Sequence, residues 1–226
     1  MHQHGAGGPG FHPPNRPIMN TSDKEEITSR YRARLAQHGT SIAALASGDI
    51  RRREIRFGRL ADVGITSGCS VLDLGCGFAD FLDYLKHSGV EVNYTGYDIM
   101  PEFIDIARAR HPEARFEVRD IQNEGITGEF DFVVSSQTFN NRYSGADNLD
   151  VIREVLRLTY GAARQGVVVD MLTSYVDFRE PHLFYYSPEE MFSFAKTLTK
   201  RVTLRHESPL YEFALYLYKD FDGWKK

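Results

Sequence analysis

The segment from Val71 to Asp80 is where residue types and spacing most directly indicate chemistry. A short apolar run that contains Asp73 leads into a turn that carries Gly75 and Gly77. Glycine lets the backbone bend sharply and lie close to a ligand, so such a turn after a buried strand is typical of a cofactor loop. A carboxylate in an apolar strand is costly to bury without a cationic or hydrogen-bonding partner, and a ligand ammonium is a candidate partner for Asp73. We therefore expect Asp73, Gly75 and Gly77 to contact a cofactor.

Two well-known nucleotide-binding signatures do not fit this turn. The dinucleotide fingerprint needs a glycine at its third position, where this chain has Asp80, so NAD is disfavoured. No Gly-Lys-Ser/Thr triplet follows Gly75, which disfavours a phosphate-binding loop for nucleoside triphosphates. A glycine turn that binds no ligand stays open as the structural alternative.

A second acidic residue follows the turn at a spacing that suggests a ribose site. Asp98 ends the next predicted strand about twenty positions after the turn, where a carboxylate can accept hydrogen bonds from both ribose hydroxyls. Ile99 and Met100 come directly after it, and we predict that they pack on an adenine face. An N-cap of the following helix is the structural alternative for Asp98.

The turn VLDLGCGFAD resembles motif I of the class I S-adenosylmethionine (SAM) methyltransferases, in which a strand ends in an acidic residue before Gly-x-Gly. This resemblance implies that SAM is the cofactor. It also implies that Asp120, in the segment RFEVRDIQ, accepts a hydrogen bond from the adenine amino group, and that the backbone N–H of Ile121 donates to a ring nitrogen. A turn or N-cap role is the alternative for Asp120.

The same resemblance places the reacting end of the cofactor beside the segment FDFVVSSQTFNNRY. It implies that Ser135 contacts the cofactor and that Ser136 and Asn140 face the reacting group. Many members that methylate nucleic-acid or protein amines carry Asn/Asp-Pro-Pro-Tyr/Phe at this point. That motif is absent here, which disfavours adenine bases and glutamine amides as acceptors.

Two further predictions rest on charge. A SAM carboxylate needs a cation, and the Arg56 guanidinium can bind it with two parallel hydrogen bonds. Aromatic rings beside a sulfonium stabilise its charge, so Tyr175 is predicted to face the reacting end of the cofactor. An ordinary helix-surface arginine and plain aromatic packing are the respective alternatives.

Hydrophobic periodicity predicts alternating strands and helices, which is typical of a parallel sheet with crossover helices. Strands are expected over 70–74, 92–98, 114–118, 131–136 and 165–171, and helices over 21–37, 50–63, 78–88, 101–110, 147–160 and 188–196. Two final strands, 202–205 and 211–218, have no helix between them and are expected to pair antiparallel. By resemblance, the fold is α/β: a Rossmann-like class I methyltransferase fold with five parallel strands, a C-terminal antiparallel hairpin and helices on both faces.

Composition limits the domain organisation and the partners. The 226 residues, 42% of them hydrophobic, suffice for one well-filled domain. We expect a disordered Gly/Pro/His-rich tail over 1–20, an N-terminal helical lid over 21–64 and the SAM-binding Rossmann-like domain over 65–226. The formal net charge of −4 argues against a nucleic-acid partner. No metal site is predicted.

The chain is also expected to be cytoplasmic and without a membrane partner. No apolar run approaches the roughly 18 residues that a membrane span needs, and no secretory signal is recognised at the N-terminus. The two cysteines, Cys69 and Cys76, flank one predicted strand and lie too far apart to bridge, so both are expected to be reduced.

These observations favour methyl transfer from SAM to a small metabolite or natural-product acceptor. The first alternative is a SAM cyclase, in which the α-amine of SAM attacks its own γ-carbon to give azetidine-2-carboxylate and methylthioadenosine, with no partner beyond SAM. The second alternative is a SAM-binding protein without catalysis. The sequence supports no prediction of oligomeric state.

Overall fold

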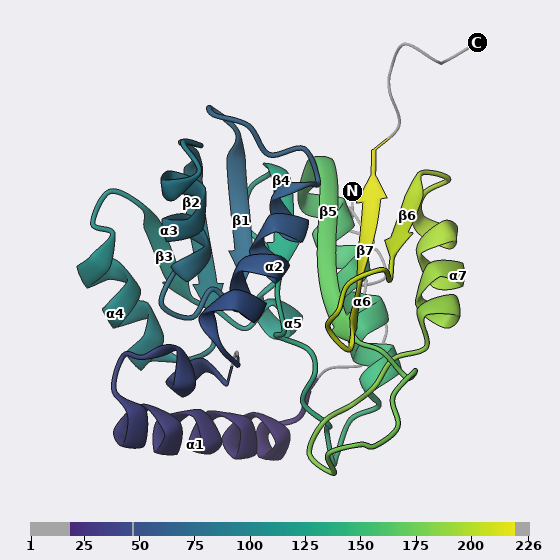
Figure 1. The fold of residues 1–226 in the computed structure, drawn as a ribbon, viewed down its shortest axis with the longest axis horizontal. Coiled ribbons are helices and arrows are strands. Elements are labelled where there is room, and N and C mark those ends of the chain that lie inside the picture. Colours follow the sequence, from purple (N-terminus) through teal and green to yellow (C-terminus); the bar gives the residue numbers. More distant parts are fainter. Residues whose placement is uncertain (1–18, 47, 220–226) are drawn as a thin grey trace, which may run out of the picture.

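Within residues 19–46 and 48–219, which the computed structural model describes, the chain forms a seven-stranded sheet with helices on both faces (Figure 1). The strands are β1 (Ser70–Leu74), β2 (Asn93–Asp98), β3 (Arg115–Val118), β4 (Phe130–Ser135), β5 (Ala163–Leu172), β6 (Val202–Arg205) and β7 (Glu212–Tyr218). The helices are α1 (Thr21–His38), the 3-10 helix η1 (Ile42–Leu45), α2 (Ile50–Ala61), α3 (Asp80–His87), α4 (Pro101–Arg110), α5 (Ile121–Glu124), α6 (Asn148–Ala162) and α7 (Pro188–Leu198).

The sheet order β3-β2-β1-β4-β5-β7-β6 confirms the predicted fold class. Strands β1 to β5 pair in parallel, and β7 lies between β5 and β6 and is antiparallel to both. The predicted strands and long helices all occur, with ends that differ by a few residues at most. The short elements η1 and α5 were not predicted, because four residues are too few to show a helical period.

Side chains alternate between two cores on either side of the sheet. In β1, Val71 packs into the core formed with α2, α3 and α4, whereas Leu72 and Leu74 pack into the core formed with α6 and α7. This alternation follows from the two-residue period of a strand. Because both faces are covered, the central strands consist of nearly continuous apolar runs.

Helix α1 lies across the edge of the sheet where the parallel strands end (Figure 1). Its contacts reach both sides of this edge: Arg32 pairs with Glu102 of α4 at 2.6 Å, and Arg30 donates to Asn141, after β4, at 2.9 Å. Helix α2 does not lie across this edge in the same way, because its Phe57 packs into the core formed with α3 and α4 on one face of the sheet. A lid over the full range 21–64 therefore stays a proposal, with α1 as the part that covers the edge.

The predicted N-terminal tail falls mostly outside the described residues, which begin at Met19. Met19 itself is buried in the core, and its backbone N–H donates to the Gln122 side chain at 2.6 Å. Asn20 is the N-cap of α1. Met19 and Asn20, which the sequence assigned to the tail, therefore contact the folded domain.

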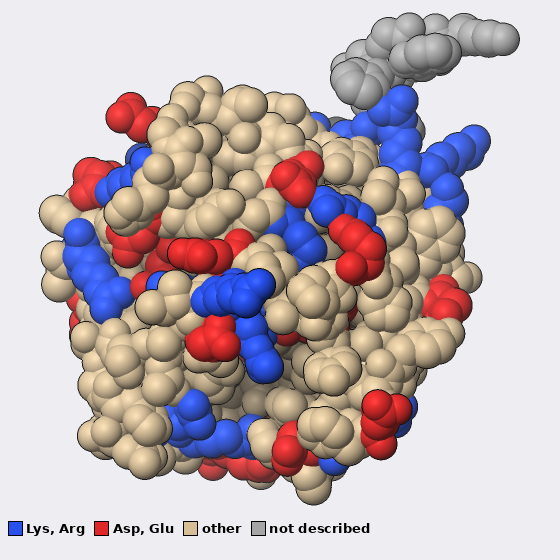
Figure 2. All heavy atoms as spheres, in the orientation of Figure 1, with Lys and Arg blue, Asp and Glu red and all other residues tan. Residues whose placement is uncertain are grey.

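Surface and thiol features are simple. Figure 2 shows Lys and Arg interspersed with Asp and Glu over the face that it draws. Cys69 and Cys76 are free thiols, as predicted. None of the helices in the described part of the chain is both long enough and apolar enough to cross a membrane.

Asp23 fastens the first turn of α1 to the loop before α6, and this contact yields a stability prediction. Its buried carboxylate accepts hydrogen bonds from Ser144 N at 2.7 Å and Gly145 N at 3.0 Å. Asp23→Ala leaves these donors unpaired, so we expect a loss of about 1–3 kcal/mol in unfolding free energy, measured by chemical denaturation. The control is Asp105→Ala, since Asp105 is exposed and, among the described residues, forms its ion pair with Arg108 on the same helix. Equal stability of the two variants would contradict this role.

Candidate cofactor and active site

The glycine turn after β1 is held by the neighbouring strand β2. Gly75 N and Cys76 N both donate to Tyr97 O, at 2.8 and 3.1 Å. Gly75 and Gly77 have φ angles of +71° and +54°, in the left-handed region that favours glycine. A Cβ on Gly75 would overlap the Thr138 side chain, so the loops after β1 and β4 touch at this point. The turn is therefore a close-packed junction of two loops as well as a candidate cofactor contact.

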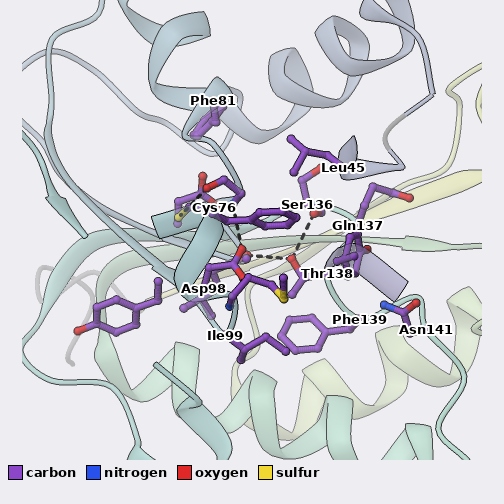
Figure 3. A pocket seen from close by; sticks show the side chains of 18 of the residues that line it. Leu45, Cys76, Phe81, Asp98, Ile99, Ser136, Gln137, Thr138, Phe139 and Asn141 are labelled. Carbon is purple, nitrogen blue, oxygen red and sulfur yellow. Dashed lines mark hydrogen bonds between the residues drawn. The ribbon is translucent and has the colours of Figure 1, made fainter. Parts of the chain in front are cut away.

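Asp98 lies at the carboxyl end of β2 and lines an apolar cavity at this edge, called cavity 1 here (Figure 3). Its two carboxylate oxygens accept hydrogen bonds from Gly77 N at 3.0 Å and Met100 N at 2.9 Å. A carboxylate has about four acceptor positions, so about two remain for the hydroxyls of a ribose. Burial raises the pKa of Asp98 to about 6. The residue thus fits the role predicted from its spacing, and that role remains a proposal.

Asp73 in β1 also lines cavity 1, and the protein supplies it with a partner. The hydroxyl of Tyr94, on β2, donates to Asp73 Oδ2 at 2.5 Å, and both residues are buried. Burial raises the pKa of Asp73 to about 7, against the opposing effect of this hydrogen bond. The cost of burying the carboxylate is therefore met partly by a tyrosine, where the sequence suggested a ligand ammonium.

Asp120 and Ile121 meet cavity 1 at the start of α5. Asp120 caps this helix, accepting from Gln122 N at 3.1 Å, and it also pairs with Lys24 of α1. The N-cap role is the structural alternative to adenine binding for Asp120. Lys24 would compete with an adenine amino group for this carboxylate. Ile121 is the first residue of the helix, where a backbone N–H has no acceptor within the helix. That N–H is suited to donate to a ring nitrogen.

The loop after β4 is fixed by Asp170 of β5. Ser136 Oγ donates to Asp170 Oδ2 at 2.7 Å, and Gln137 N donates to Oδ1 at 2.7 Å. Gln137 has a φ of +59°, a left-handed conformation that these bonds hold in place. Thr138 Oγ1 then donates to Leu74 O at 2.9 Å. Ser136 therefore lines cavity 1 with its hydroxyl committed to Asp170.

Arg56 meets a protein carboxylate where a cofactor carboxylate was predicted. Its Nη2 donates to Glu212 Oε1 at 2.6 Å and its Nε to Glu212 Oε2 at 2.9 Å, and both side chains are buried. Arg59 binds the same carboxylate at 3.0 Å. Glu212 lies more than 150 positions further along the chain. It therefore binds Arg56 in the bidentate arrangement that was predicted for the SAM carboxylate.

Three other predicted residues lie away from cavity 1. Ser135 is buried and its hydroxyl donates to Leu74 O at 3.0 Å, tying β4 to β1. Asn140 is buried and accepts from Leu172 N at 3.0 Å. Tyr175 is 62% exposed, and its hydroxyl donates to Glu189 at 2.5 Å. The structure therefore does not bring Tyr175 or the Ser135 side chain to the predicted site. Ser135 is hydrogen-bonded to Leu74, and Tyr175 is exposed to solvent and bonded to Glu189.

A second cavity, called cavity 2 here, adjoins cavity 1. Five residues line both cavities: Tyr31, Leu45, Arg56, Gln137 and Asn141. Leu45, Gln137 and Asn141 are labelled in Figure 3, where Gln137 and Asn141 lie on the same side of the view. Asn140, predicted to be catalytic, lines cavity 2. The arrangement offers one space for a cofactor and a connected space for a second group.

Sequence reasoning missed several residues that shape these cavities. Asp170 is an acidic residue within the apolar run GVVVDML, which is the same signal that drew attention to Asp73. Tyr31 and Ile27 of α1 line cavity 1, but the helix pattern alone does not show that α1 crosses the edge of the sheet. Thr138 could not be found from the sequence, because its role depends on contact with a loop 63 positions earlier, at Gly75.

The contact between Gly75 and Thr138 predicts a steric cost. Gly75→Ala combines a positive φ with overlap, whereas Gly125 has the same φ of +71° and open space around its Cβ position. We expect Gly75→Ala to lower the unfolding free energy by about 1–3 kcal/mol more than Gly125→Ala does, as measured by denaturant titration. If both variants lose the same stability, the close approach of the two loops is not a constraint.

A family model described as a methyltransferase domain matches residues 71–160. The chain is 36% identical over 155 residues to "Putative methyltransferase Rv1506c" of Mycobacterium tuberculosis, and the match covers 66% of this chain and 93% of that protein.

Solved structures share the fold. The complex of DhpI with S-adenosylhomocysteine (SAH) has a TM-score of 0.63 and 18% identity, over 87% of this chain and 97% of that chain. The SAH complex of magnesium protoporphyrin IX methyltransferase (ChlM) from Synechocystis PCC 6803 has a TM-score of 0.60 and 12% identity, over 88% of this chain and 100% of that chain.

The matched region begins in the strand that leads into the glycine turn. The mycobacterial relative is matched over nearly its whole length. The resemblance seen in motif I is thereby confirmed: the chain belongs to the class I SAM-dependent methyltransferases.

Proposed function

We propose that the chain transfers the methyl group of SAM to a small-molecule acceptor, a metabolite or natural product. The observation that carries this proposal is the pair of connected cavities at the carboxyl edge of the sheet. Cavity 1 has the acidic strand end and the glycine turn expected for the adenosyl part of SAM. Cavity 2 offers a separate space for an acceptor. ChlM is a magnesium protoporphyrin IX methyltransferase, which supports a small-molecule acceptor within the same fold.

The residues present fit SAM by the chemistry of their donors and acceptors. Asp98 retains acceptor positions for ribose hydroxyls, and Ile121 N–H is suited to an adenine nitrogen. Met100 is buried in a small apolar cluster with Phe103 and supplies a surface for the adenine ring. Asp73 remains a candidate for the cationic end of the cofactor. These roles, with Gly75 and Gly77 as backbone contacts, are proposals.

When bound, SAM supplies a methyl group on a sulfonium, which is already a good leaving centre. The chain therefore has to align an acceptor and exclude water, and it needs no covalent nucleophile. Ser136 and Gln137 are held by Asp170 at the junction of the two cavities, so they can position the reacting groups. Helix α1 covers the edge and restricts access of water. Asn140 is assigned to positioning, because its side chain bonds Gln137 and Leu172.

Product analysis tests the proposed reaction. Purified protein with SAM and acceptor extracts is expected to form SAH, detected by mass spectrometry, and to form none without an acceptor.

Asp98→Ala should weaken SAM binding about 10- to 100-fold, because it removes a charged hydrogen-bond acceptor. Asp105→Ala, an exposed aspartate on α4, is the control and should bind normally.

Two outcomes would replace the proposal. Methylthioadenosine and azetidine-2-carboxylate from SAM alone would establish the cyclase alternative on the same fold. Saturable SAM binding without any product, with or without extracts, would leave a binding protein. An unchanged dissociation constant for Asp98→Ala would remove the ribose role from Asp98.

Burial of Asp98 also predicts pH-dependent binding. Its pKa is about 6, raised by burial, and ribose hydroxyls donate best to the ionised carboxylate. Binding therefore favours ionisation, and affinity should fall as pH drops through 6, becoming about tenfold weaker at pH 5 than at pH 7. Asp73, with a pKa of about 7, acts in the same direction. Calorimetric titration with SAM checks this, and Asp98→Asn should make the profile shallower, leaving the part that Asp73 contributes. A flat wild-type profile would contradict the prediction.

A further inference from the structure

Cavity 2 carries an excess of positive charge. Four arginines line it, Arg30 and Arg34 from α1 and Arg52 and Arg56 from α2. Among its described lining residues, Glu212 is the only acidic one. The cavity is therefore suited to an anion unless Glu212 neutralises these side chains.

Glu212 does not neutralise all four arginines, because its single charge is shared between Arg56 and Arg59. Its carboxylate binds Arg56 at 2.6 Å and Arg59 at 3.0 Å, and all three side chains are buried. Arg59 lies outside the lining of cavity 2. The charges of Arg30, Arg34 and Arg52 therefore have to be met by other groups.

The acidic partners of Arg30 and Arg52 are solvent-exposed, and Arg30 also donates to Asn141 at 2.9 Å. Arg30 pairs with Glu26, whose side chain is 58% exposed, at 3.0 Å. Arg52 pairs with Asp49, whose side chain is 65% exposed, at 3.7 Å. Exposed pairs of this kind contribute little and are easily exchanged for another anion.

Arg34 has a donor that the protein leaves unused. Its Nη2 donates to the backbone oxygen of Ala43 at 2.5 Å. Its Nε is buried and has no hydrogen-bond partner in the described part of the chain. A buried donor without an acceptor is costly, and like charges four residues apart on a helix, such as Arg30 and Arg34, repel. One anion between them would satisfy the donor and relieve the repulsion.

We propose that cavity 2 is a carboxylate-binding site, with Arg34 as the central ligand and Arg30 and Arg52 beside it. The proposal rests on the proposed function for the identity of cavity 1 as the cofactor site. It assigns an acid group to the molecule that occupies cavity 2. Two molecules can present that group next to the cofactor cavity: a separate acceptor, or SAM itself through its methionine end.

Binding measurements with Arg34→Met separate these two sources. In the first arm, the dissociation constants of SAH and methylthioadenosine are compared, because methylthioadenosine lacks the amino-acid end. In the second arm, SAH-saturated protein is titrated with benzoate and with its neutral analogue benzamide. The control is Arg32→Met, on the same helix, since Arg32 pairs with Glu102 and does not line cavity 2. Arg34→Lys keeps the charge and serves as the conservative variant, and circular dichroism checks that each variant is folded.

A separate acid-bearing acceptor predicts that wild-type protein prefers benzoate to benzamide at least tenfold and that Arg34→Met removes this preference without changing SAH affinity. The methionine end of SAM predicts that Arg34→Met weakens SAH at least tenfold and leaves methylthioadenosine unchanged. Arg34→Lys should recover part of either effect, and Arg32→Met should show none. The proposal is overturned if Arg34→Met changes neither comparison. Because binding is measured without turnover, absence of methyl transfer in the product assay would count against the proposed function alone.

Discussion

Burial of three carboxylates near the carboxyl ends of β1, β2 and β5 constrains the whole site. Each needs hydrogen-bond donors, because an unpaired charge in an apolar environment is costly. Asp73 takes the hydroxyl of Tyr94, Asp98 takes two backbone N–H groups, and Asp170 takes donors from the loop after β4. The loops that supply the donors to Asp98 and Asp170 also line cavity 1. Satisfying the acids therefore shapes the cavity.

The two cavity-lining loops act as one unit because of a single close approach. Asp98 holds the glycine turn through Gly77, and Asp170 holds the loop after β4 through Gln137. Thr138 joins them, since its hydroxyl bonds Leu74 O and its side chain fills the space where Gly75 would carry a Cβ. A change in either loop is transmitted to the other by contact. Sequence-distant residues thus determine the geometry that the glycine turn alone does not specify.

The sequence predicted the parts of the site that depend on local pattern or fixed spacing. The strands and helices followed from periodicity, and Asp98 lines the cavity as its distance from the glycine turn suggested. Partners brought together only by folding could not be predicted: Arg56 meets Glu212 from the start of β7. Tyr175 lies in a loop without a periodic pattern, where composition does not indicate which rings face inward. The role of Asp170 could have been predicted, because an acidic side chain inside an apolar run needs a hydrogen-bond partner.

The charges around the two cavities affect the reaction barrier. Cavity 1 is lined by four aspartates and three arginines and cavity 2 by four arginines and one glutamate, so positive charge is concentrated around cavity 2. An anionic acceptor that attacks a sulfonium loses charge as the two partners approach the transition state. A site that excludes water penalises charged reactants more than such a partly neutralised transition state. Arginines that bind the acid group too tightly would reverse this benefit if that group were itself the nucleophile. Arg34, with one donor already given to Ala43 O, is suited to hold an acid group without surrounding it.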